Sequence, residues 1–155
     1  MDNQEKKRQA ETQFQSYLDR NNIPYWYVQQ DLCTYSQTLK DFNVQRPDFF
    51  VLIPHFGFIL IDVELREPLD KYKKFCLCNE KATKYENLLK YFNLSIWYAF
   101  SNDKIHYDTW YFISITTVLQ LRKRFLVKEK QYISAPIEYF IPIATTEKIT
   151  KIFQS

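Results

Sequence analysis

Gly57, the only glycine of the chain, lies at the junction of two strongly apolar runs, PDFFVLIP at residues 47–54 and FGFILIDVEL at residues 56–65. Proline ends a strand and glycine tolerates turn conformations, so the PHFG stretch at 54–57 predicts a tight connection. In the second run, apolar side chains occupy both alternating sets of positions, which is typical of a strand buried on both faces. The two runs therefore predict a hairpin at the centre of a covered sheet.

Helices and further strands are predicted around this hairpin. Residues 2–20 contain no proline or glycine and place apolar side chains at helical spacing, which predicts an amphipathic first helix. We also expect a strand in IPYWYVQQ (23–30), a polar connection at 34–46, a helix from about Glu80 to Phe92 with Asn79 as N-cap, strands in LSIWYAF and DTWYFISI, and a short helix TTVLQLRKRF capped by a threonine. The predicted fold class is α/β, with a central mixed sheet of about five strands flanked by helices.

The composition indicates one domain. The chain has 155 residues, of which 46% are hydrophobic and 18% aromatic, so we expect a single domain with a substantial core. The net charge of +3 is compatible with a polyanionic partner. Three cysteines, an odd number, favour reduced thiols, and no apolar run approaches the roughly 18 residues of a membrane span, so a cytoplasmic protein without membrane association is expected.

Acidic residues interrupt the two central strands. Asp48 opens the first, and Asp62 and Glu64, two apart and therefore on one face, end the second. A hairpin brings residue 48 back beside the end of its partner strand. Like charges at a partly buried site oppose one another's ionisation unless a cation joins them, and Mg²⁺ or Mn²⁺ suits carboxylate oxygens. The pattern predicts a metal site; the alternative is three solvated acids paired with Arg46 and Arg66.

Two charged residues on the predicted helices border this site. Lys81 falls within the apolar stripe of the helix at 80–92, so its ammonium either reaches the carboxylates, or a phosphate held there, or extends to solvent. Lys84 lies toward the edge of that stripe. Glu11 borders the inner face of the first helix and is either a fourth acidic group of the site or a solvated acid.

This arrangement resembles the PD-(D/E)XK nuclease superfamily, which has the restriction-endonuclease-like fold, and most of all its small Holliday-junction-resolvase-like members. The resemblance rests on a helix with an inward Glu11, the PD of Asp48, the acidic end of the next strand at Asp62, and a following helix with lysine and tyrosine. It covers about residues 5–115, so it implies a nuclease-like core there and a C-terminal extension at 116–155 of the same domain. It implies that Asp48 and Asp62 are the two metal-binding acids. Glu64 stands where the family usually has its catalytic lysine.

The resemblance also implies how the departure at Glu64 is accommodated. Some members of the superfamily carry a glutamate there, and others move the lysine to the following helix, for which Lys81 is the first candidate and Lys84 the second. A shifted alignment, in which Glu64 and Arg66 are the acidic and basic pair, is also compatible with the sequence. The implied catalytic set is Asp48, Asp62, Glu64, Lys81 and Glu11, and the implied metal ligands are Asp48, Asp62 and Glu64.

The implied activity is phosphodiester hydrolysis assisted by Mg²⁺ or Mn²⁺, with DNA preferred to RNA as the substrate. Basic residues and one tyrosine are the expected nucleic-acid contacts, with a solvated surface as the alternative reading: Arg66, Lys84, Tyr85, Arg122, Lys123 and Arg124. Many relatives act as homodimers, so a homodimer is expected here. The competing function is an inactive nuclease-fold module that binds nucleic acid or a protein.

Overall fold

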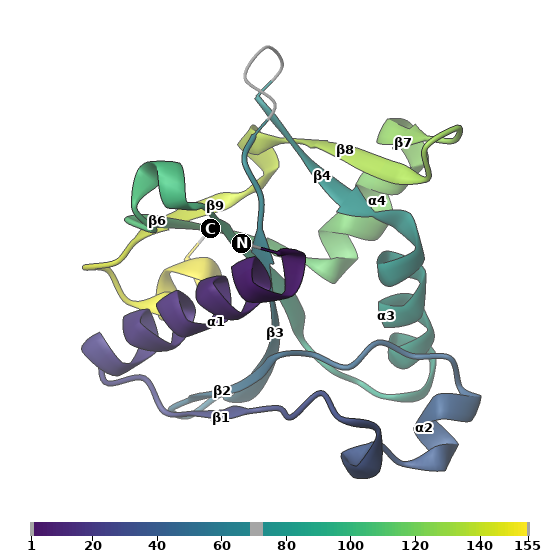
Figure 1. Cartoon of the computed structure of the whole chain (residues 1–155), viewed down its shortest axis with the longest axis horizontal. Helices are drawn as coiled ribbons and strands as arrows, with labels where there is room; N and C mark the ends of the chain where they lie inside the picture. The colour runs from purple at the N-terminus through teal and green to yellow at the C-terminus, as the bar shows by residue number, and fades with distance from the viewer. Residues whose placement is uncertain (1, 69–72, 155) are drawn as a thin grey trace.

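The central sheet of the computed structural model, which describes residues 2–68 and 73–154, has six strands in the order β1-β2-β3-β5-β6-β9 (Figure 1). The strands are β1 (Tyr25–Tyr27), β2 (Phe49–Ile53), β3 (Gly57–Leu65), β5 (Ile96–Ser101), β6 (Thr109–Ser114) and β9 (Ile141–Ala144). β3 and β5 run parallel, and the other neighbouring pairs run antiparallel. The predicted α/β class with a mixed sheet is therefore confirmed, and β9 adds a strand from the tail.

The hairpin of β2 and β3 forms where the sequence predicts it. Gly57 has a φ of +123°, and His55 in the turn has a φ of 65°, so both lie in the conformational region that favours glycine. Ile53 pairs with Gly57, and Phe49 pairs with Ile61. Continuing this register by one residue sets Asp48 opposite Asp62, so the acidic residues meet at the end of the hairpin away from the turn.

Helices cover both faces of the sheet (Figure 1). On one face, α1 (Asn3–Arg20) packs its buried residues, Phe14 among them, against Ile59, Ile61 and Val63 of β3. On the other face, α3 (Asn79–Tyr91) and α4 (Ile115–Phe125) pack around Leu60. Because side chains alternate along a strand, Asp62 and Glu64 continue the row of Leu60, on the side of α3.

Some elements were not anticipated. A second sheet has the order β4-β8-β7 and consists of β4 (Lys74–Cys78), β8 (Tyr132–Pro136) and β7 (Leu126–Val127). The polar connection contains a short helix α2 (Gln37–Asp41), and the chain also has 3-10 turns at Leu32–Thr34, Asp103–Ile105, Ile137–Tyr139 and Ile149–Phe153. β4 was not predicted, because what makes it a strand is its pairing with β8, more than 50 residues later in the chain.

Two predicted helix caps are wrong by one or two residues. Asn79 is the first residue of α3, and Cys78 holds the cap position without a side-chain cap hydrogen bond. The Asn79 amide instead donates to Gln131 Oε1 at 3.1 Å. Helix α4 is capped by Ser114, not by a threonine, and the Ser114 hydroxyl accepts a hydrogen bond from the backbone N–H of Thr117 at 3.2 Å. A serine that ends a strand thus also begins the next helix.

Replacing Ser114 with alanine is expected to lower the free energy of unfolding by about 1 kcal/mol, because the N–H of Thr117 then loses its capping acceptor. Urea denaturation measures this loss. Thr116→Ala is the matched control, since Thr116 is exposed in the same first turn and should change stability by less than about 0.5 kcal/mol. Equal losses in the two variants would contradict the assignment of the cap to Ser114.

Candidate functional site

The Asp48 carboxylate is fixed between the two strands of the hairpin. Its backbone N–H donates to the carbonyl of Ile61 at 2.9 Å, which extends the ladder by one residue beyond β2. The N–H of Val63 donates to Asp48 Oδ2 at 2.7 Å. Asp48 is only 5% exposed. The carboxylate therefore has a defined position at the end of the sheet.

Asp62 lies deeper and is surrounded by hydrogen-bond donors. The hydroxyl of Tyr85, from α3, donates to Asp62 Oδ2 at 2.5 Å. The ammonium groups of Lys81 and Lys7 lie 3.4 and 3.5 Å from Asp62 Oδ1. Asp62 is 1% exposed, so this carboxylate is held by α1 and α3 together.

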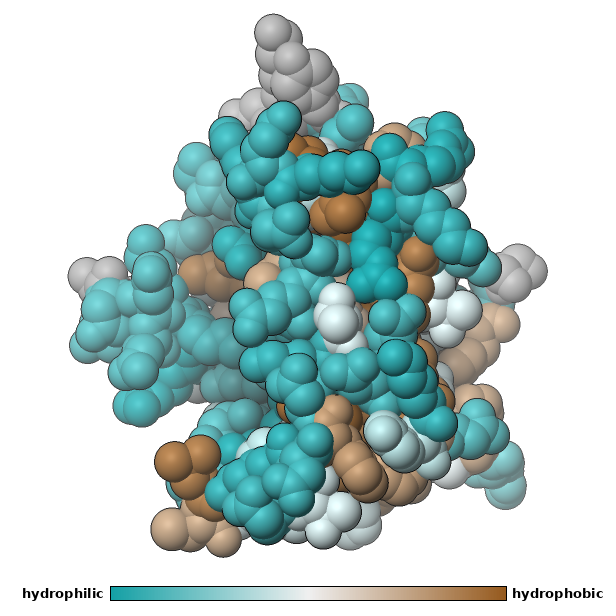
Figure 2. Space-filling model, turned by 90° about the vertical axis from the view of Figure 1, so that its right-hand side faces the viewer, coloured by the Kyte–Doolittle hydropathy of each residue, from teal (hydrophilic) through white to brown (hydrophobic). Residues whose placement is uncertain are grey.

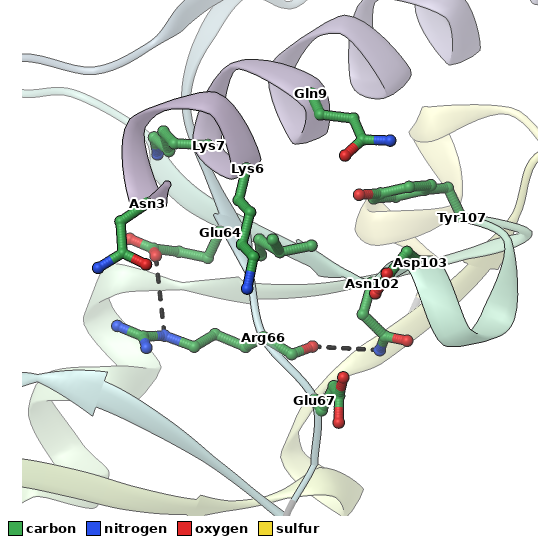
Figure 3. A pocket seen from close by; sticks show the side chains of 11 residues that line it. Asn3, Lys6, Lys7, Gln9, Glu64, Arg66, Glu67, Asn102, Asp103 and Tyr107 are labelled. Carbon is green, nitrogen blue, oxygen red and sulfur yellow. Dashed lines mark hydrogen bonds and ion pairs between the residues drawn. The ribbon is translucent and has the colours of Figure 1, made fainter. Parts of the chain in front are cut away.

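Lys81 bridges two of the acids, which is one of the alternatives that its place in the helical stripe left open. Its Nζ lies 2.5 Å from Glu64 Oε1 in addition to its contact with Asp62. The other oxygen of Glu64 lies 3.9 Å from Arg66 Nε (Figure 3). Lys84, the second candidate, pairs with Glu80 at 3.6 Å on its own helix, so the structure places Lys81 and not Lys84 beside the acids.

Lys7 also lies at this site, although it is not among the residues predicted from the sequence. Its Nζ lies 3.0 Å from Asp48 Oδ2 and also donates a hydrogen bond to the carbonyl oxygen of Val63. A signal was present: Lys7 lies three, four and seven residues before Ala10, Glu11 and Phe14, all buried on the inner face of α1.

Glu11 and Tyr27 form the outer edge of the site. Glu11 is 8% exposed, and the Tyr27 hydroxyl donates to Glu11 Oε2 at 3.1 Å. Glu11 lines the same hollow as Asp48 and Asp62. Glu11 is therefore a buried acid beside these two carboxylates and not a solvated one.

Burial and neighbouring charges shift the acids in opposite directions. Burial, with the nearby Asp62 charge, raises the pKa of Asp48 well above its ordinary value, and the same two causes raise the pKa of Glu64. Burial alone would also raise the pKa of Asp62, but Lys7, Lys81 and the Tyr85 hydrogen bond lower it below its ordinary value. Asp62 is thus the acid whose ionised form the site stabilises.

In metal-free buffer, we expect the free energy of unfolding to rise as the pH is lowered through the raised pKa values of Asp48 and Glu64 toward about 5. The folded pKa of Asp48 and of Glu64 is raised, so the folded state binds more protons than the unfolded state between their unfolded values of about 4 and their folded values. Stability is then gained on acidification through this window. Urea titrations at several pH values measure the slope.

Asp48→Asn is the control for this pH dependence, because the amide keeps an oxygen for the N–H of Val63 but does not titrate. The slope should become smaller in the variant. A wild-type stability that falls steadily between pH 8 and 5 would contradict the directions given for Asp48 and Glu64. The depressed pKa of Asp62 acts the other way only below about pH 5, where its unfolded carboxylate begins to protonate.

The oxygens around Lys7 suit a hard cation. Asp48 Oδ2, Asp62 Oδ1 and the carbonyl of Val63 all face one positively charged group, the Lys7 ammonium. Mg²⁺ is typically bound by one or two carboxylates together with waters and substrate phosphates. These residues therefore fit a divalent ion, with the lysine ammonium standing at the place of the cation.

The expected set of three carboxylate ligands is not formed. Within residues 2–68 and 73–154, no group of three or more His, Cys, Asp or Glu side chains is gathered closely enough to hold one metal ion. Glu64 directs its carboxylate to Lys81 and Arg66 instead, because these cations offset the cost of burying it. The metal ligands supported by the geometry reduce to Asp48, Asp62 and the backbone of Val63.

Two hollows open beside the site, and Lys7 lines both. One, of about 720 Å³, is also lined by Lys6, Glu64 and Arg66 (Figure 3). The other, of about 480 Å³, is lined by Glu11, Asp48, Asp62 and Lys81, among others. The carboxylates are thus reached from the surface on the side of the N-terminal turn of α1.

Some of the expected nucleic-acid contacts are exposed, and others are buried or paired with another side chain of the protein. Tyr85 is fully buried and donates to Asp62, so its expected role as a nucleic-acid contact is wrong. Arg122 is engaged by Glu86 at 3.0 Å. Lys123 and Arg124 are exposed on α4. The face that includes α3 and α4 is mostly hydrophilic, with smaller hydrophobic areas in its upper middle and along its lower edge (Figure 2).

Comparison with solved structures identifies the fold. The Holliday junction resolvase Hjc from the archaeal hyperthermophile Archaeoglobus fulgidus matches with a TM-score of 0.58 and 12% identity, over 97% of each chain. A nuclease from a fusselovirus matches with a TM-score of 0.39 and 15% identity, over 83% of this chain and 77% of its own. No protein-family model and no curated protein matches the sequence.

The chain therefore has the restriction-endonuclease-like fold that the sequence pattern predicted, which it shares with the archaeal protein over nearly its whole length. None of the helices in the described ranges has the length and apolar character needed to cross a membrane.

Proposed function

We propose that this protein is a metal-dependent nuclease that hydrolyses phosphodiester bonds, with DNA as the preferred substrate. The observation that carries the proposal is the convergence of Asp48, Asp62 and Lys81 at the end of the β2–β3 hairpin. Two buried acids that can hold a divalent ion, with an ammonium group beside them, suit metal-assisted hydrolysis of a phosphodiester, and they lie on a fold shared with a Holliday junction resolvase.

Asp48, Asp62 and the carbonyl of Val63 would hold the ion, because they are the oxygens already directed at one cation. When bound there, Mg²⁺ or Mn²⁺ supplies an activated water and positive charge at the scissile phosphate. The backbone N–H of Val63 and the hydroxyl of Tyr85 fix the two carboxylates, so their orientation is set before the ion arrives.

Lys81 takes the role of the lysine that Glu64 displaces. Its ammonium lies within 3.4 Å of Asp62, beside the proposed ion, where it would orient a water and stabilise negative charge on a phosphate. Glu64 holds the Lys81 ammonium in place at 2.5 Å. The glutamate thus positions a lysine that comes from a helix and not from its own strand.

Basic residues near the larger hollow are suited to guide a polyanion. Lys6 extends from α1 toward this hollow, and Arg66 crosses its floor (Figure 3). Lys6 is exposed, and the Arg66 side chain is 48% exposed, so both remain accessible to phosphate groups. We propose that a nucleic-acid strand passes over this hollow to reach the carboxylates.

Incubation of the purified protein with linear, branched and single-stranded DNA and with RNA tests the function. With Mg²⁺ or Mn²⁺, we expect DNA products that disappear when EDTA removes the metal. Asp48→Asn is the matched variant, because it keeps the size and the hydrogen bond to Val63 while it removes one charge from the ion site. It should give no products above background.

The outcomes separate active from inactive forms of the fold. Cleavage that is equal in the wild type and in Asp48→Asn would come from a contaminant and would contradict the proposal. Binding of DNA without cleavage under any metal condition would favour the competing function, a nucleic-acid-binding module on a nuclease fold.

A further inference from the structure

The Lys7 ammonium occupies the place that the proposed ion would take. Three oxygen atoms from two strands face it: Asp48 Oδ2 at 3.0 Å, Asp62 Oδ1 at 3.5 Å and the carbonyl of Val63. The Lys7 side chain extends away from α1 to hydrogen-bond acceptors that are 41 and 56 residues away in the chain, so its direction is set by the hairpin and not by a neighbour on its own helix. The oxygens therefore form a cation site that one of the chain's own side chains fills.

We propose that Lys7 is an exchangeable internal counter-ion, which occupies the cation site in the metal-free protein and is displaced from it when a divalent ion binds. This inference rests on the proposed function, since it concerns the same site. It adds that the protein regulates access to its metal site with its own lysine.

The charges and sizes favour exchange over simultaneous binding. Asp48, Asp62 and Glu64 bring three negative charges to the site, and Lys7 and Lys81 bring two positive charges. With a divalent ion in the place of Lys7, the ion and Lys81 together would bring three positive charges. Mg²⁺ binds oxygen at about 2.0–2.1 Å, so the same oxygens would have to close in by about 1 Å around a smaller centre. An ammonium at hydrogen-bonding distance from these oxygens leaves no room for that ion.

The displaced side chain has a place to go. Lys7 lines both hollows beside the site, and its side chain is already 34% exposed, so a change of rotamer is enough to carry its ammonium into solvent. Lys81 retains Glu64 as its own partner and does not need to move. After exchange, the Lys7 ammonium would border the larger hollow, where a phosphate oxygen of the substrate is the anion available to it (Figure 3).

Binding of Mn²⁺, measured by electron paramagnetic resonance or calorimetry without any substrate, tests the exchange. The ion must displace the ammonium in the wild type, so its apparent affinity is reduced by the occupancy of Lys7. We expect Lys7→Met to bind Mn²⁺ about tenfold more tightly than the wild type. Lys6→Met is the matched control: it removes one charge from an exposed neighbour on the same turn and should change the affinity by less than about twofold.

A second measurement uses the wild type alone and so does not depend on a variant that folds. Amine acetylation followed by mass spectrometry should modify Lys7 slowly without metal and several-fold faster when Mn²⁺ is present, because the amine then leaves the carboxylates. Lys6 should be modified at the same rate in both conditions, since it makes no contact with these oxygens.

Each result decides a different claim. Equal Mn²⁺ affinity in the wild type and Lys7→Met, or weaker binding in Lys7→Met, would overturn the exchange and leave the metal-dependent nuclease intact. Unchanged acetylation of Lys7 on metal binding would also overturn the exchange. If neither protein binds Mn²⁺, or if Asp62→Asn binds it as well as the wild type, the proposed metal site itself fails and the exchange fails with it.

Discussion

Lys81→Met is expected to lower the rate of DNA cleavage by about 100-fold or more, the range seen when one donor that stabilises developing charge is removed. Its ammonium lies within 3.4 Å of Asp62 and 2.5 Å of Glu64, so methionine of similar length removes the charge with little change in packing. Single-turnover cleavage with saturating Mg²⁺ measures the chemical step directly.

Lys84→Met provides the matched control for this prediction. Lys84 is one turn further along the same helix, pairs with Glu80 and makes none of the contacts to the acids, so we expect less than about a threefold change, as for a peripheral phosphate contact. Equal losses of cleavage rate in the two variants would show that Lys81 acts only through general electrostatic attraction of the DNA. Full activity in Lys81→Met would show that the site works without a helical lysine.

The hairpin and its acids could be predicted from the sequence because their signals are local. A single glycine between two apolar runs fixes the turn, and once Ile53 pairs with Gly57, the register sets Asp48 opposite Asp62 without further information. Lys81 could be predicted for a similar reason, since it interrupts an otherwise apolar stripe of α3. The local pattern of the sequence was therefore enough to bring the carboxylates together and to single out Lys81, one of the two lysines that contact them.

Lys7 was not predicted as a site residue, because the apolar residues that mark the inner face of α1 begin only at Ala10. Continued by one turn toward the N-terminus, the same stripe contains a lysine, as it does on α3. Glu11 is also buried on this face of the helix. A charged residue on the inner stripe of a helix is thus as informative as an apolar one, once an acidic site is expected beneath it.

Elements that depend on distant partners could not be predicted from local pattern. β4 forms by pairing with β8, and its sequence, KFCLC, lacks the length and the flanking turn signals of the central strands. Tyr85 shows the same difficulty for a single side chain: an aromatic residue near basic ones suggests stacking on a base, yet the residue is fully buried. Its hydroxyl finds Asp62, 23 residues earlier in the chain.

The buried partnership of Asp62 with Tyr85 should dominate the stability of the site. Asp62→Ala is expected to lower the free energy of unfolding by about 2–3 kcal/mol in metal-free buffer at neutral pH, the range for hydrogen bonds to a charged group. The larger loss of about 3–5 kcal/mol for an unpaired buried ion does not apply, because Lys7 still pairs with Asp48 and Lys81 still pairs with Glu64 in this variant.

A double-mutant cycle with Tyr85→Phe, measured by urea denaturation, isolates that partnership. Alone, Tyr85→Phe should cost about 1.5–3 kcal/mol, because it removes the donor to a buried carboxylate. In the Asp62→Ala background, the same change should leave the free energy of unfolding unchanged or raise it, since the hydroxyl is then an unpaired polar group in a buried position.

Asp62→Asn should have a free energy of unfolding between those of the wild type and Asp62→Ala, because its amide oxygen still accepts from the tyrosine. Additive losses across the cycle would contradict a stabilising hydrogen bond between Tyr85 and Asp62. The contribution of Tyr85 to stability would then come from the packing of its ring against Tyr98.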